Sequence, residues 1–190
     1  MTPQRRENFK RLLKPRHIAF IGGRYAIIAI HEARRRGFGG EMFAVNPTRS
    51  DLEGVPCVAS IEELPVAPDA VYLAIPASDV VGAVRTLSDM GAGGVVCFSA
   101  GFKEAGNNQT ELDLIEATGN MALIGPNCYG VINYIDNSAL WSFEHGGWSP
   151  GLWRCDYNSI RYVFVRYYDE PALFASSLHG FGRQPGGFGA

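Results

Sequence analysis

Short apolar runs alternate along most of the chain with segments whose apolar positions recur every three or four residues. Such runs are typical of strands buried on both faces, and the recurring segments are typical of helices that cover them. The apolar runs are residues 17–21, 42–45, 70–75, 94–98 and 121–124. Strands that alternate with helices predict an α/β fold with a doubly wound parallel sheet.

The helices are indicated by spacing and by end signals. Residues 25–36 keep their apolar side chains on one face and end in three arginines, which favour the negative end of a helix dipole. A capping box is predicted at Ser60 and Glu63, and Ser78 or Asp79 is predicted to cap the helix after the third strand. Further helical patterns lie at 80–87 and 112–117, with a short amphipathic lead at 9–13.

Each predicted strand ends at residues that interrupt a sheet. The interruptions are Gly22, Asn46-Pro47, Pro76, Ser99-Ala100-Gly101 and Gly125-Pro126. Because the carboxyl ends of parallel strands meet at one edge of an open sheet, we expect these turns to line one crevice. Small or kinked residues in all of these turns favour a ligand that approaches the backbone closely.

Composition and charge narrow the function classes. A chain of 190 residues suffices for one domain, and a hydrophobic share of 46% supplies an ordinary core. The net charge of −2 gives no basic face for nucleic acid or membranes, and no apolar run approaches the roughly 20 residues that span a bilayer. The charged first 15 residues do not resemble a secretory signal. We therefore predict a cytoplasmic protein that binds neither nucleic acid nor membrane.

The turn after the first strand gives the first information about a ligand. It has the sequence Gly22-Gly23-Arg24-Tyr25-Ala26, not the Gly-x-Gly-x-x-Gly of dinucleotide sites, although amides at a helix amino end suit a pyrophosphate. The second strand ends in Asn46, where an NAD site has an acidic residue. An amide with Arg49 nearby suits a phosphate close to the ribose, and a solvated loop charge is the alternative for Arg49.

Five motifs in this order resemble the coenzyme A domain of NDP-forming acyl-CoA synthetases, the group that includes succinyl-CoA synthetase. They are Gly37-Phe38-Gly39-Gly40, Val45-Asn46-Pro47, Ile75-Pro76, Gly101-Phe102-Lys103-Glu104 and Gly125-Pro126-Asn127-Cys128-Tyr129-Gly130-Val131-Ile132-Asn133. The similarity extends from about Pro15 to His145. The first loop departs from the family: it is shorter, with Arg24-Tyr25 where small residues are common.

The resemblance implies that these turns bind coenzyme A. The first loop would lie at the phosphates, the 99–101 turn against the nucleotide and pantetheine, and the 125–128 loop toward the reacting end. The implied contacts are Gly22, Gly23, Arg24, Asn46, Pro47, Arg49, Ile75, Pro76, Ser99, Ala100, Gly101, Asn127 and Cys128. At Gly125 and Gly130 we expect either a positive φ or a close approach of the backbone to the ligand.

No catalytic residue and no metal site are predicted. Cys128 lacks an apparent His-Asp partner and is interpreted as a small thiol in a tight loop, and Cys97 as a core residue. His17 and His31 are interpreted as structural, and Glu104 as a surface charge. The four cysteines lack the spacing of metal ligands.

The predicted function is the coenzyme A domain of an acyl-CoA synthetase. The family's mechanism uses a phosphorylated histidine in a succinyl-CoA-ligase-like domain and an ATP-grasp domain that phosphorylates it. Neither is recognisable here, so this chain alone is predicted to be inactive. A stand-alone coenzyme A binding module is the alternative, and an NAD-linked oxidoreductase is a weaker third possibility.

The expected organisation is a lead at 1–14, a coenzyme A domain at 15–147 and an irregular tail at 148–190. The tail crowds aromatic residues without a helical or strand period. The family's next segment contains Gln-Ser-Gly, and the codons of Asn158-Ser159-Ile160-Arg161, read one base later, permit Ile-Gln-Ser-Gly. Residues 170–175 and 183–186 also permit later family residues in that frame. We therefore interpret the tail as an out-of-frame translation of the family's own gene.

Overall fold

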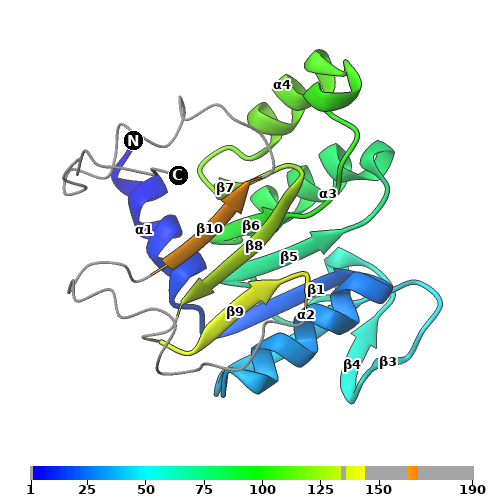
Figure 1. The fold of residues 1–190 in the computed structure, drawn as a ribbon, viewed down its shortest axis with the longest axis vertical. Coiled ribbons are helices and arrows are strands. Elements are labelled where there is room, and N and C mark those ends of the chain that lie inside the picture. Colours follow the sequence, from blue (N-terminus) through cyan, green and yellow to red (C-terminus); the bar gives the residue numbers. More distant parts are fainter. Residues whose placement is uncertain (1, 134–135, 144–161, 167–190) are drawn as a thin grey trace, which may run out of the picture.

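A seven-stranded sheet forms the centre of the molecule (Figure 1). The computed structural model describes residues 2–133, 136–143 and 162–166. The strand order is β3-β4-β2-β1-β5-β6-β7, and all neighbouring pairs are parallel except β3 with β4. The strands are β1 His17–Gly22, β2 Glu41–Val45, β3 Asp51–Leu52, β4 Val55–Val58, β5 Ala70–Ala74, β6 Gly94–Cys97 and β7 Ala122–Ile124. The predicted doubly wound α/β sheet is confirmed.

Helices cover both faces of this sheet. They are α1 Pro3–Leu13, α2 Arg24–Arg35, α3 Ala77–Met90 and α4 Asn108–Ala117, with short 3₁₀ turns η1 Ile61–Glu63 and η2 Lys103–Ala105. Along β1, Ile18 and Phe20 pack with α1 and α2, whereas Ala19 packs with α3 and α4. This alternation explains why the strand sequences are apolar throughout.

A second, antiparallel sheet has the order β10-β8-β9. Its strands are β8 Cys128–Asn133, β9 Ser138–Trp141 and β10 Tyr162–Arg166. Val131 of β8 and Leu140 of β9 are buried in the same cluster as α1 and α2, so this sheet helps to cover that face of the main sheet. The sequence pattern did not predict β3, β4, β8 and β9. Strands β3, β4 and β9 have only two to four residues, and β8 follows closely on the interruption at Gly125-Pro126.

Two cap predictions were wrong. No side chain caps α3: its N-cap is Pro76, and the Ser78 hydroxyl donates to Asp79 Oδ1 (3.1 Å) instead. Ser60 likewise makes no capping bond, because residues 61–63 form only one 3₁₀ turn, although Glu63 does accept from the Ala59 amide (3.2 Å). Pro76 precedes α3, and η1 is a single short turn. Neither start uses a side-chain oxygen to accept a hydrogen bond from the backbone.

The expected irregular tail differs from the structure at one segment. Residues 162–166 form β10, paired antiparallel with β8. The rest of the tail lies outside the described residues. None of the helices in the described part of the chain is long and apolar enough to cross a membrane.

Candidate functional site

The strand order reverses direction between β1 and β5, and ligands of open α/β sheets bind in a crevice at such a switch point. From β1 the chain passes to β2 on one side, and after β4 it returns to β5 on the other side. The helices that follow β1 and β5, α2 and α3, pack on opposite faces of the sheet. The connections after these two strands therefore diverge, and we call the region between them at the carboxyl ends of β1 and β5 the crevice.

The loop after β1 is braced by β2. Gly22 has a φ of 136°, and a Cβ there would lie 2.3 Å from the carbonyl oxygen of Ala74 on β5, so only glycine fits. The Asn46 side-chain amide donates to the Gly22 carbonyl (2.8 Å), and its oxygen accepts from the Thr48 amide (3.0 Å). Asn46 thus fixes the shape of the first loop, with both ends of its side chain bonded within the protein.

The loops after β5, β6 and β7 are joined through Ser99. The Ser99 hydroxyl donates to the Ile75 carbonyl (2.6 Å) and accepts from the Ile75 amide (3.2 Å). The Ser99 carbonyl accepts from the Asn127 amide (2.9 Å). Ser99 is buried. Three residues that the sequence assigned to the site are therefore one hydrogen-bonded rim.

Glu104 shapes the turn that follows this rim. Its carboxylate accepts from the amides of Gly101 (2.6 Å) and Phe102 (3.3 Å), while the Asn107 side chain donates to the Gly101 carbonyl (2.8 Å). Phe102 is fully buried beneath the turn. Glu104 is exposed, as expected for a surface charge, and it also holds the turn, because its carboxylate reaches the amides of the residues two and three positions before it.

The nine-residue loop motif serves mainly as scaffold. A Cβ at Gly125 would lie 2.4 Å from the Cys97 carbonyl oxygen, and one at Gly130 would lie 1.9 Å from that of Leu140. Both glycines also have positive φ, at 105° and 132°. At the motif's end, Asn133 donates to the Leu13 carbonyl (2.9 Å), beyond the amino end of the sheet. The glycine requirement therefore comes from the protein's own backbone.

The two cysteines near the motif are buried. Burial raises the pKa of the Cys97 thiol to about 12, so this thiol is neutral near pH 7. Cys128 is 3% exposed. The interpretation of Cys97 as a core residue is confirmed. Cys128 has the burial expected of a packed thiol and not that of an accessible nucleophile.

Aromatic side chains that the sequence analysis did not assign to the site lie beside the crevice. Tyr25, in the first turn of α2, has its ring centroid 4.4 Å from that of Phe98, directly after β6. Phe98 lies 6.3 Å from the buried Tyr72, whose hydroxyl donates to Ser142 (2.9 Å). Burial raises the pKa of Tyr72, which keeps this donor protonated. The sequence feature that could have identified Tyr25 as a site residue is the shortened first loop, in which it stands.

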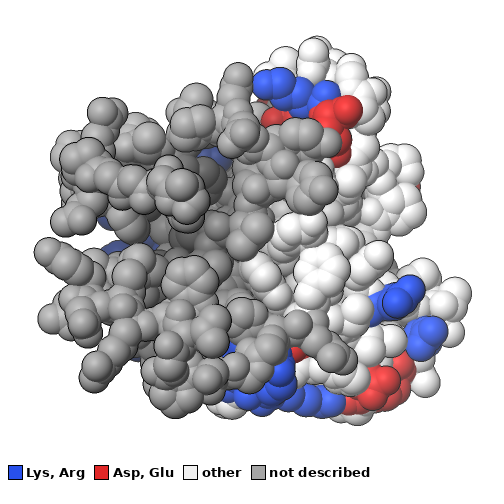
Figure 2. All heavy atoms as spheres, viewed as in Figure 1, with Lys and Arg blue, Asp and Glu red and all other residues white. Residues whose placement is uncertain are grey.

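Three further predicted contacts lie at the start of α2 and in the connection after β2. Gly23 is the N-cap of α2, where no side chain makes a capping bond, and Arg24 beside it is exposed. Arg49 is exposed in the connection from β2 to β3. Near the site, Figure 2 shows uncharged surface between the charges around α4 and those around α2 and the β3–β4 hairpin.

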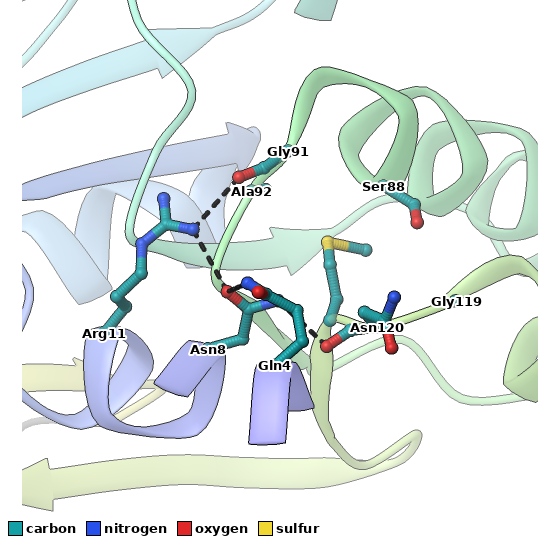
Figure 3. Close-up of a pocket in the computed structure, with 9 residues that line it drawn as sticks. Gln4, Asn8, Arg11, Ser88, Gly91, Ala92, Gly119 and Asn120 are labelled. Carbon is teal, nitrogen blue, oxygen red and sulfur yellow. Dashed lines mark hydrogen bonds between the residues drawn. The ribbon is translucent and has the colours of Figure 1, made fainter. Parts of the chain in front are cut away.

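A cavity of about 330 Å³ lies at the opposite edge of the sheet, between α1 and the ends of α3 and α4 (Figure 3). Its polar groups bond to one another: Asn8 donates to the Asn120 carbonyl (2.9 Å), and Arg11 donates to Asn8 (3.2 Å) and to the Gly91 carbonyl (3.1 Å). None of the predicted site residues lines it. The crevice at the carboxyl edge is therefore the better candidate site.

Comparison with known proteins gives a family match over most of the chain. The family model described as "CoA binding domain" matches residues 16–134, which include all the loops of the crevice. A trans-feruloyl-CoA synthase from an unknown prokaryotic organism is 36% identical over 153 residues, 76% of this chain and 22% of that protein. The ADP-forming acetate–CoA ligase I of Archaeoglobus fulgidus is 35% identical over 133 residues, 65% of this chain and 19% of the relative.

A solved structure supports the same relationship. The dinucleotide-forming acetyl-coenzyme A synthetase 1 of Ca. Korarchaeum cryptofilum, in its apo form, aligns with a TM-score of 0.67 and 25% identity. The alignment covers 70% of this chain and 31% of that chain. This chain thus spans only about a fifth of the two curated relatives. The family expected from the sequence motifs is confirmed: the chain belongs to the CoA binding domain family.

Proposed function

We propose that this chain is the coenzyme A binding part of an ADP-forming acyl-CoA synthetase, with coenzyme A lying across the crevice between β1 and β5. The observation that carries the proposal is the family match over residues 16–134, which spans every loop of that crevice. Relatives of this chain are ADP-forming ligases of acetate and 4-hydroxybutyrate, which use coenzyme A as a substrate.

The residues of the crevice suit the parts of coenzyme A. The amides of Gly23 and of the first turn of α2 would hold the pyrophosphate, because a helix amino end attracts anions. Arg24 and Arg49 supply exposed positive charge for the pyrophosphate and the 3′-phosphate. The rim of Ile75, Ser99 and Asn127 offers backbone close to the rest of the ligand.

The remaining predicted contacts are proposed on position alone. They are Pro47 after β2, Pro76 after β5, Ala100 and Gly101 after β6, and Cys128 after β7. We propose residues 15–147 as the coenzyme A domain of a cytoplasmic enzyme. The phosphohistidine and ATP-grasp parts of the complete enzyme would activate the acid, and this chain would bring only the thiol substrate.

Calorimetric titration of the purified chain with coenzyme A and with NAD tests the proposal. We expect coenzyme A to bind more tightly, because Asn46 stands where an NAD site has an acidic residue. Incubation with acetate, ATP and coenzyme A should give no acyl-CoA above background. Tighter binding of NAD would overturn the assignment, and turnover by the purified chain would overturn its dependence on further domains.

A further inference from the structure

We propose that Tyr25 and Phe98 form an apolar wall for the pantetheine arm of coenzyme A, and that Tyr25 determines how strongly this chain holds that arm. The inference rests on the proposed function and adds to it a residue pair and the part of the ligand that the pair contacts. It concerns Tyr25 because the first loop of this chain is short, and Tyr25 therefore stands in the first turn of α2.

The geometry places the Tyr25 ring beside the crevice, against the residue that follows β6. Tyr25 starts from the α2 side of β1, and its ring reaches Phe98 at the end of β6. In the sheet, β5 lies between β1 and β6. The pair of rings, 4.4 Å apart and tilted by 44°, therefore spans the carboxyl end of β5. Phe98 is held from below by the buried Tyr72.

The Tyr25 side chain is partly open to solvent. Its exposed fraction is 40%, although its ring already contacts one aromatic neighbour. A fixed ring with one free face is suited to cover an apolar segment of a ligand. Phe98 beneath it keeps the ring in place, so little side-chain entropy is lost when the ligand binds.

Charge decides which arm of the ligand lies there. With the pyrophosphate at the amino end of α2, one arm must extend toward β2 and the other toward β5 and β6. Arg49 follows β2 and attracts the arm that carries the 3′-phosphate. The side of β5 and β6 carries Tyr25 and Phe98. Figure 2 shows uncharged surface between the charges around α4 and those around α2. The uncharged pantetheine arm, with its geminal methyl groups, fits this side.

The test compares two ligands on the full chain. Coenzyme A and 3′-phospho-ADP share the adenosine, the 3′-phosphate and the pyrophosphate, and only coenzyme A carries pantetheine. We expect Tyr25→Ala to weaken coenzyme A binding roughly threefold to tenfold, the range for one aromatic contact, and to leave 3′-phospho-ADP binding unchanged. Tyr25→Phe, which keeps the ring, should bind both ligands as the unmodified chain does.

Leu112→Ala is the matched control, because Leu112 is an exposed apolar residue on α4, outside the crevice. Thermal unfolding of each variant confirms that it is folded. Equal weakening of both ligands by Tyr25→Ala would overturn the pantetheine assignment, and so would unchanged binding of both. Tighter binding of coenzyme A would show that Tyr25 obstructs the crevice. If the unmodified chain binds no coenzyme A, the proposed function fails instead.

Discussion

At the scale of single residues, several side chains of the family motifs act on the protein's own backbone. Asn46 bonds the Gly22 carbonyl, Glu104 bonds two amides of its turn, and Ser99 bonds both backbone groups of Ile75. Each of these bonds fixes a loop that borders the crevice. A ligand would therefore meet loops already in place, which lowers the ordering entropy lost on binding.

The glycines of the 125–133 motif lead to a prediction on stability. We expect Gly125→Ala and Gly130→Ala each to lower the free energy of unfolding by at least ~1–3 kcal/mol, because both have positive φ and a Cβ would meet a neighbouring carbonyl. Urea unfolding measures the change. Gly82→Ala is the control: it lies in α3 with open space around its Cβ position and should stabilise the chain slightly.

The sequence analysis gave these glycines two alternative roles, and the positive φ is the one described above. The other role is a close approach of the backbone to the ligand. Full stability combined with a loss of coenzyme A affinity would favour that role. A matching loss of stability and affinity would favour the scaffold role described above.

At the scale of elements, one buried carboxylate attaches α1 to the sheet. Asp69, directly before β5, accepts from Arg11 Nε of α1 (2.7 Å) and from Arg16 Nε (3.0 Å) and the Arg16 amide (3.0 Å) before β1. The carboxylate is 1% exposed. The two guanidinium groups and the amide hold the pKa of Asp69 well below its usual range, despite the opposing effect of burial.

This network predicts a pH dependence of stability. The pKa of Asp69 in the folded chain lies below its value of about 3.9 in the unfolded chain. The contribution of Asp69 to the free energy of unfolding is therefore fully present above that pH and declines as the pH falls below it. We expect Asp69→Asn to lower the free energy of unfolding by about 2 kcal/mol near pH 7, since hydrogen bonds to a buried charge are lost. The difference from the unmodified chain should narrow toward about pH 3.

Chemical unfolding at both pH values measures this difference. Asp89→Asn, at an exposed position near the end of α3, is the control and should change stability by no more than ~0.5 kcal/mol. A difference for Asp69→Asn that stays constant with pH would contradict an ionic role for this carboxylate.

At the scale of the whole molecule, the described residues form the crevice without the tail. The loops after β1, β2, β5, β6 and β7 all lie within residues 16–134, the range of the family match. The codons of the tail carry a separate proposal, that the correct reading of the gene departs from the present one after about residue 147.

Resequencing the gene tests that proposal. We expect the DNA, read one base later, to encode Gln-Ser-Gly at the codons of Ser159, Ile160 and Arg161. The two-fold codons of Asn158, Tyr162, Glu170 and Gln184 could each have forbidden the family's residues in that frame and do not. A stop codon before Gln-Ser-Gly in the shifted frame, or other residues there, would contradict the proposal.

The sequence by itself determined the five parallel strands β1, β2, β5, β6 and β7 and the edge proposed for the site, but not the short strands β3 and β4. Apolar runs of four to six residues define strands buried on both faces, and glycine or proline after each run ends the strand. Both signals are local, so they can be recognised without any contact between distant residues. The order of the motifs also identified the family before the fold was known.

Only the tertiary structure decided what the motif residues contact. Asn133 bonds Leu13, 120 positions away, and Gly130 is required by Leu140 on a strand that the pattern did not predict. The pairing of Tyr25 with Phe98 depends on β5 lying between β1 and β6. Such partners are set by strand order and register, which bring together residues that no local pattern relates.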